Sequence, residues 1–160
     1  MLSRHRRFAT RTVLALMLLA CGSLAYADGT WDGTWQLNVA KSKFEPGPPL
    51  KSQTRTIKTE GDMQTQTIKT VTADGKNTST ISTYRLDGKD YPITGSAEFD
   101  SVAVKQVDES TIDGTLKRAG KAAAATSRTL SKDKKTLTVT TKGTNRDGQT
   151  MHNVMVFDRQ

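Results

Sequence analysis

The sequence has few of the residues that build disulfides, metal centres or base-stacking surfaces. Cys21 is its only cysteine, so no disulfide can form within the chain. Cys21 and His5 both lie in the N-terminal segment discussed below, which leaves His152 alone, and a zinc site needs three or four ligands. Aromatic residues make up 6% of the chain, and no cluster of basic and aromatic residues suits nucleic-acid bases. The composition therefore predicts no cofactor, no protein-bound metal and no nucleic-acid partner.

The chain also lacks an apolar run long enough to cross a bilayer, which takes roughly 20 residues. Its first 27 residues instead have the order of an export signal: four arginines without an acid, the apolar run 13–20, and the small-residue site Ala25-Tyr26-Ala27. We expect residues 1–27 to be a cleaved signal peptide. Residues 28–160 would then form a single domain that is periplasmic or secreted.

A second processing route remains open at Cys21. The residues Leu18-Leu19-Ala20-Cys21 resemble the lipobox of bacterial lipoproteins, in which the cysteine becomes the acylated N-terminus. Cleavage after Ala27 would release the domain, whereas acylation at Cys21 would anchor it to a membrane. The membrane is a partner only in the second case.

The formal charge of +8 overstates how basic the mature domain is. Four of the 24 basic residues and none of the 16 acidic ones lie in the signal, which leaves a charge of +4. The remaining charges alternate in sign, as in Asp87-Gly88-Lys89-Asp90, and form no long block. Such mixing is typical of a solvated surface and not of a charged interaction tail.

Threonine-rich segments with high β-propensity follow one another through the rest of the chain. In Lys135-Thr136-Leu137-Thr138-Val139-Thr140, apolar and polar residues alternate as they do on a half-buried strand. The strands predicted in this way are Thr34–Val39, Gln53–Thr59, Met63–Thr72, Thr78–Leu86, Ser101–Val107, Thr111–Lys117, Ala122–Leu130, Lys135–Lys142 and Thr150–Asp158.

Asp-Gly pairs and other turn residues separate these strands at near-regular intervals, for example at residues 74–75 and 147–148. Asp-Gly favours tight hairpins because glycine accepts the positive φ that such turns require. Helix signals are nearly absent, since Gly120 interrupts the one alanine-rich stretch. The pattern predicts an all-β fold, an antiparallel up-and-down meander that closes into a small soluble barrel of about eight to ten strands. A membrane barrel is excluded because the strand at 52–58 has no lipid-facing side.

Both ends of the mature chain resemble one family. Gly33-Thr34-Trp35 resembles the Gly-x-Trp signature of the lipocalins and their fatty-acid-binding relatives, and Val156-Phe157-Asp158-Arg159 is similar to their closing strand. The chain as a whole resembles bacterial exported lipocalin-like (calycin-type) barrels. The resemblance implies that Trp35 closes one end of the barrel and that Arg159 packs on its ring in a cation–π contact. Residues 45–49 are too rich in proline to form the helical pair that fatty-acid-binding proteins have there.

Three functional hypotheses follow from the predicted barrel. The first is a non-catalytic barrel that binds a small, partly apolar ligand, with Tyr84, Tyr91, Phe99, His152 and Met155 as candidate lining residues. The second is an envelope structural or interaction module that uses its outer sheet surface. This hypothesis would be favoured by a barrel interior filled by apolar strand residues: Leu37, Ile57, Ile68, Ile81, Val104, Leu116, Leu137, Val139 and Val154. The third is an enzyme, which would need His152 in a cleft beside a carboxylate. The sequence predicts no catalytic residue and no oligomeric state.

Overall fold

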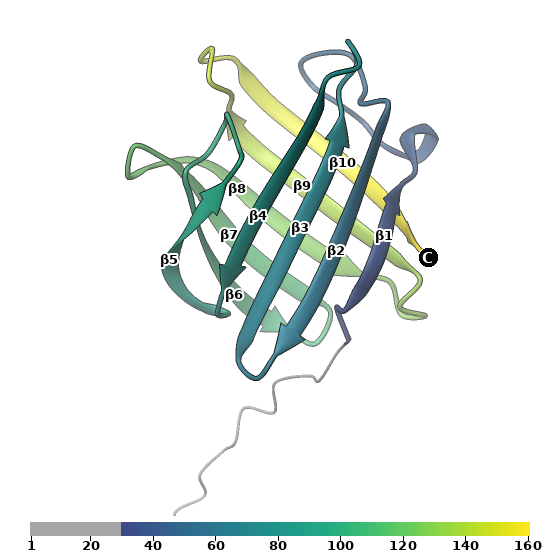
Figure 1. The fold of residues 1–160 in the computed structure, drawn as a ribbon, viewed down its shortest axis with the longest axis vertical. Coiled ribbons are helices and arrows are strands. Elements are labelled where there is room, and N and C mark those ends of the chain that lie inside the picture. The colour runs from purple at the N-terminus through teal and green to yellow at the C-terminus, as the bar shows by residue number, and fades with distance from the viewer. Residues whose placement is uncertain (1–29) are drawn as a thin grey trace, which may run out of the picture.

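The computed structural model describes residues 30–160, which form a closed barrel of ten antiparallel strands (Figure 1). Each strand pairs with its neighbour in the chain, and the short first strand pairs with both the second and the last. The prediction of an all-β meander closing into a small barrel is therefore confirmed. The predicted export signal at residues 1–27, with Cys21, lies outside the described residues.

Within residues 30–160, short turns or loops join most of the strands, whereas the longer connection from β1 to β2 begins with the 3₁₀ turn η1. The elements are β1 (Gly33–Leu37), η1 (Val39–Lys41), β2 (Ser52–Glu60), β3 (Met63–Val71), β4 (Asn77–Tyr84), β5 (Asp87–Thr94), β6 (Ser101–Asp108), β7 (Thr111–Arg118), β8 (Lys121–Leu130), β9 (Thr136–Thr144) and β10 (Thr150–Arg159).

Alternation of side chains gives the barrel an inside and an outside. In β9, Leu137 and Val139 are buried, while the adjacent Thr136, Thr138 and Thr140 are more exposed. The same period of two runs through β2, where Gln53, Arg55 and Ile57 are the buried residues. The interior therefore receives polar as well as apolar side chains, and this mixture decides where a ligand could bind.

The sequence patterns predict nine of the ten strands and miss β5. Asp87-Gly88 is typical of a tight turn, and Pro92 lacks the N–H that a central strand donates. In the structure β5 pairs with β6 through an irregular register between Asp87 and Asp90, and Pro92 lies opposite Ser101. The bulge and the proline are accommodated because β5 is poorly paired on its other side.

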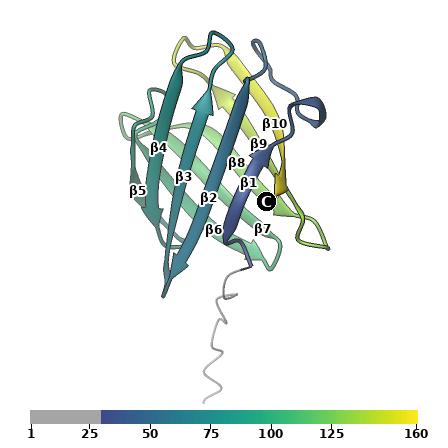
Figure 2. The same cartoon turned by 45° about the vertical axis from the view of Figure 1, so that its right-hand side comes forward.

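The seam between β4 and β5 is the least paired in the barrel. Only Ile81 with Thr94 and Ser82 with Ile93 face each other across it. Beyond Thr94 the chain leaves the sheet and forms the loop 95–100 before β6 begins. This loop lies at one end of the barrel, beside the first residues of β4 (Figure 2).

The opposite end of the barrel is filled by buried apolar side chains. There β1, β7 and β9 begin and β2, β8 and β10 end. Trp35 and Phe157 have no exposed surface, and the Nε1 of Trp35 donates to the carbonyl of Trp31 at 3.1 Å. The same cluster contains the fully buried aliphatic residues Ile57, Ile112 and Leu137. We call this packed end the floor of the barrel.

Arg159 on β10 ties the floor together. Its Cζ lies 4.1 Å from the centroid of the Trp35 ring. Its Nε donates to the carbonyl of Lys134 at 2.7 Å, and its Nη2 donates to the carbonyl of Thr30 at 2.9 Å. Gly33 has a φ of +134°, and a Cβ there would lie 2.9 Å from the Nη1 of Arg159. The glycine of the Gly-Thr-Trp motif therefore leaves room for the guanidinium.

The connection from β1 to β2 contains no α-helix, as its prolines lead one to expect. Lys43 and Val154 exchange two backbone hydrogen bonds of 2.8 and 2.9 Å, and the N–H of His152 donates to the carbonyl of Glu45 at 2.7 Å. Since β1 has five residues and β10 has ten, this segment covers the edge of β10 that β1 leaves unpaired.

Candidate ligand-binding site

A cavity of about 760 Å³ occupies the barrel on the side away from the Trp35 cluster. Every strand except β1 contributes to its lining. Much of the wall is apolar, with Ile68, Val104, Leu116, Val139 and Met155 among the lining residues. Small-molecule sites commonly enclose roughly 300–1,000 Å³. The cavity thus has the size and the apolar wall that a small ligand requires.

Arg128 on β8 forms the first half of a polar region deep in this cavity. Only 4% of its surface is exposed. Its Nη1 donates to the hydroxyl of Tyr84 at 2.7 Å and to the Oε1 of Gln66 at 3.2 Å. The Tyr84 hydroxyl in turn donates to the Oε1 of Gln64 at 3.0 Å. Neutral groups from β3 and β4 therefore orient the guanidinium of Arg128 from one edge.

Arg55 on β2 forms the second half, and only 7% of its surface is exposed. Its Nε donates to the Oε1 of Gln53 at 3.0 Å, and the Nε2 of Gln53 donates to the Oγ1 of Thr70 at 2.9 Å. Its Cζ lies 4.9 Å from the centroid of the Phe157 ring. The guanidinium of Arg55 thus stacks on Phe157 of the floor and also lines the cavity.

Among residues 30–160, neither of the two arginines forms an ion pair with an acidic side chain. Burial and then the charge of Arg128 lower the pKa of Arg55 to about 9, so it stays protonated at neutral pH. The Nη2 of Arg128 is buried and has no hydrogen-bond partner among residues 30–160. The other charged lining residues are Lys76 and Glu98. Because an unpaired buried charge is costly, this region favours an anionic group.

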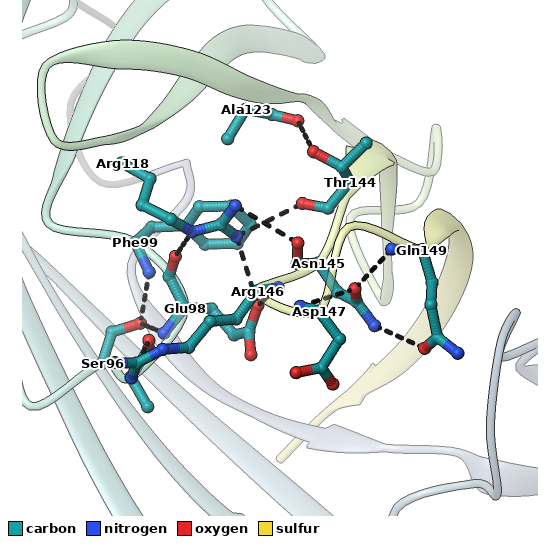
Figure 3. Close-up of polar contacts among 11 residues, drawn as sticks. Ser96, Glu98, Phe99, Arg118, Ala123, Thr144, Asn145, Arg146, Asp147 and Gln149 are labelled. Carbon is teal, nitrogen blue, oxygen red and sulfur yellow. Dashed lines mark hydrogen bonds and ion pairs between the residues drawn. The ribbon is translucent and has the colours of Figure 1, made fainter.

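The mouth of the cavity is bordered by the loop 95–100, which Arg118 holds in place (Figure 3). The Nε of Arg118 donates to the carbonyl of Glu98 at 2.8 Å, and its Cζ lies 5.4 Å from the centroid of the Phe99 ring. The Glu98 carboxylate accepts from the Nη2 of Arg118 at 3.3 Å and from the N–H of Arg146 at 2.8 Å. The negative charge of Glu98 is therefore engaged at the rim and is not directed at Arg55 or Arg128.

Gly95 fixes the start of this loop against β4. Its φ is +81°, which favours glycine, and a Cβ would lie 2.1 Å from the carbonyl oxygen of Ser79. Only glycine allows the loop to approach the backbone of β4 this closely. The loop thereby borders the cavity next to the sparsely paired seam.

Three of the five predicted lining residues do line the cavity: Tyr84, Phe99 and Met155. The other two, Tyr91 and His152, do not. The hydroxyl of Tyr91 donates to the Oδ2 of Asp87 at 3.1 Å in an exposed pair. His152 is exposed, and since Met151 and Asn153 on either side line the cavity, its side chain points outward.

The sequence patterns did not identify Arg55 and Arg128, the two buried charged residues of the cavity. A signal for both is present in the alternation of their strands. Arg55 stands two residues before Ile57, and Arg128 stands two before Leu130, so each shares the face of a core residue. A charged residue in phase with buried apolar ones is a pointer to an interior site.

Residues 30–160 contain no cluster of three or more histidine, cysteine or acidic residues that could hold a metal ion. Within the same range no helix is long and apolar enough to cross a membrane.

A scan against protein-family models and a search of curated proteins find no match to this chain. Solved structures do resemble it. Zebrafish ileal bile acid-binding protein complexed with cholic acid has a TM-score of 0.52 and 14% identity, over 82% of this chain and 99% of that one. Rv2717c from M. tuberculosis has a TM-score of 0.54 and 18% identity, over 82% of this chain and 93% of that one. These two likenesses show the fold alone, a closed antiparallel β-barrel.

Proposed function

We propose that this protein binds a small, partly apolar ligand with an anionic group inside its barrel and performs no chemistry on it. The observation that carries the proposal is the cavity of about 760 Å³ with two buried arginines in its lining. Apolar side chains offer contact to a hydrophobic body, and Arg55 and Arg128 offer charge-assisted hydrogen bonds to an acidic group. The zebrafish neighbour, solved with cholic acid, supports the idea that this fold can hold such a molecule.

The interaction-module hypothesis would be favoured by an interior filled by apolar residues. Instead, Ile68 and Leu116 line the cavity, and Ile81 is 46% exposed on the outside. The catalytic hypothesis requires His152 in a cleft beside a carboxylate, but its side chain is exposed. Ligand binding is therefore the function that the geometry supports best.

Binding can be tested with sodium dodecanoate and the neutral 1-dodecanol as probes, which compete with a fluorescent apolar dye for the purified protein. We expect dodecanoate to displace the dye at lower concentration than dodecanol. Ile68→Trp would fill part of the cavity and weaken the binding of both probes. Ile81→Trp makes the same change on the outer surface and should leave their binding unchanged. Equal binding to both variants, with folding verified by circular dichroism, would place the ligand outside the barrel.

We further propose that the domain works outside the cytoplasm. The support is the sequence order of residues 1–27, and the two processing routes predict different mature proteins. N-terminal mass determination on protein from the native host would find either a chain beginning at Asp28 or an acylated Cys21. An intact N-terminus would contradict both routes.

A further inference from the structure

The charge balance of the cavity points to a more specific ligand than an acidic amphiphile in general. Its charged lining residues are Arg55, Arg128, Lys76 and Glu98. Glu98 is held by Arg118 at the rim, and Lys76 is exposed. The deep part of the cavity therefore carries two positive charges with no internal compensation.

The two guanidiniums also line the same cavity, and Arg128 donates to Gln66 on β3, the strand that pairs with β2 of Arg55. β2 and β8 stand on different sides of the barrel, with β1, β10 and β9 between them on the shorter way round. Arg128 nevertheless reaches Gln66 and Tyr84, and its charge lowers the pKa of Arg55. The two guanidiniums repel each other, and this repulsion destabilises both. An anionic group placed between them would be attracted by each.

The donors that remain free agree with a head group of several oxygens. Among residues 30–160, the guanidinium of Arg55 uses only its Nε, which donates to Gln53, so Nη1 and Nη2 remain. The Nη2 of Arg128 also lacks an acceptor there. A carboxylate has one charge and two oxygens. A phosphate monoester has close to two charges at pH 7 and three terminal oxygens, and arginine pairs with it through two parallel hydrogen bonds.

We propose that the ligand is an amphiphile with a doubly charged head group of the phosphate-monoester type, bound between Arg55 and Arg128, with its apolar part against the apolar wall of the cavity. This rests on the proposed function, because it specifies the ligand of the same cavity. No covalent step is involved.

The test compares four probes that contain twelve carbons each and differ in the head group: dodecyl phosphate, dodecyl sulfate, dodecanoate and dodecanol. Each is measured below its aggregation concentration by dye displacement at pH 7.5. We expect dodecyl phosphate to bind about tenfold more tightly than either monoanion, since one more charge-assisted interaction is gained. The preference for phosphate should disappear in both Arg55→Met and Arg128→Met. Lys142→Met removes an exposed positive charge from β9 and should preserve it.

The pH dependence of binding separates the effect of the head group's charge from that of its shape. The second ionisation of a phosphate monoester lies near pH 6, so its advantage over the sulfate should shrink at pH 5. Arg55, Arg128 and Tyr84 face the head group, and Lys76 and Glu98 stand at the mouth. Dodecyl sulfate meets the same groups and keeps its charge, so it corrects for any titration of the protein.

The outcomes distinguish the two proposals. Equal affinity for phosphate, sulfate and dodecanoate at pH 7.5 would overturn the doubly charged head group and leave the anionic-ligand function standing. Equal affinity for dodecanol as well would remove the role of the arginines. Absence of binding by all four probes would contradict the proposed function itself.

Discussion

The charged side chain of Arg55 lies where it destabilises the folded protein. It is buried on the Phe157 ring, it faces a second positive charge, and its Nε donates to the neutral Gln53. Burial and Arg128 lower its pKa to about 9, which means that the fold disfavours the charged form. Residues that oppose stability in this way are typical of functional sites, because the cost is recovered when a ligand binds.

We therefore expect Arg55→Met to stabilise the protein in the absence of ligand. Methionine has a similar length, packs well on an aromatic ring and carries no charge to bury. Replacing buried charges by apolar residues of similar volume often raises the free energy of unfolding, by about 1 kcal/mol or more here. Urea denaturation monitored by tryptophan fluorescence measures the change. Lys142→Met, at an exposed position, should shift the midpoint little. A loss of stability on Arg55→Met would mean that the charge is compensated in the folded state.

Some of the residues that line the cavity were predictable from the sequence. Tyr84 and Met155 were predicted to line the interior, and they do. Arg55 and Arg128 were assignable from the phase of Ile57 and Leu130, once each strand was taken to have one inward face. That these two side chains meet was not predictable, because β2 and β8 are distant in sequence and their approach depends on closure of the whole barrel.

At the scale of elements, local turn chemistry explains why nine strands were predicted from the sequence and one, β5, was not. Strong turn residues delimit β3, β4 and β9, and their interiors alternate regularly. β5 begins with the turn-like Asp87-Gly88 and contains Pro92, so local preferences contradict its conformation. It is a strand because β6 pairs with it, which is a tertiary effect that single-sequence patterns do not contain.

Turn aspartates add a pH dependence to these elements. The Oδ1 of Asp133 accepts from the hydroxyl of Ser131 at 2.6 Å and from the N–H of Lys135 at 3.1 Å, in the turn between β8 and β9. The Ser131 hydrogen bond first, and then that of the Lys135 backbone, lower the pKa of Asp133 below its ordinary value of 3.8. A carboxyl whose pKa is lower in the folded state stabilises the fold above pH about 4, and this contribution is lost as the pH falls through the folded pKa.

Asp133→Asn keeps an acceptor oxygen and removes the charge. We expect a lower urea midpoint than that of the unchanged protein at pH 7, and a difference that shrinks as the pH is lowered to 2. Asp147→Asn is the matched control, because the Asp147 side chain is exposed in another turn and accepts no hydrogen bond among residues 30–160. A midpoint difference for Asp133→Asn that stays constant with pH would show that the folded and unfolded pKa values are equal.

At the scale of the whole molecule, the barrel separates stability from binding along its axis. The floor contains two of the three largest fully buried residues, Trp35 and Phe157, whereas the third, Tyr84, lines the cavity in the other half. The sequence predicts the floor because Gly33-Thr34-Trp35 and the closing strand resemble a known pattern. It does not predict the cavity, since an interior volume depends on how side chains from nine strands meet across the barrel.

This separation can be tested at Arg159, which joins β10 to the segment before β1 and to the β8–β9 turn. Lysine in its place keeps the charge but loses the planar fork that stacks on Trp35 and donates to the carbonyls of Thr30 and Lys134. We expect Arg159→Lys to lower the free energy of unfolding by about 2 kcal/mol, the value of one or two charge-assisted hydrogen bonds. The single cooperative unfolding transition should be retained, since both ends belong to one sheet.

The affinity for the dodecyl probes should be unchanged in Arg159→Lys, because neither Arg159 nor Trp35 lines the cavity. Arg85→Lys is the control for the loss of a guanidinium fork: Arg85 pairs with Asp62 on the surface, where ion pairs contribute little. A weaker affinity in Arg159→Lys with unchanged stability would reverse the assignment of the two ends. A joint loss of both would show that the floor must close for the cavity to keep its shape.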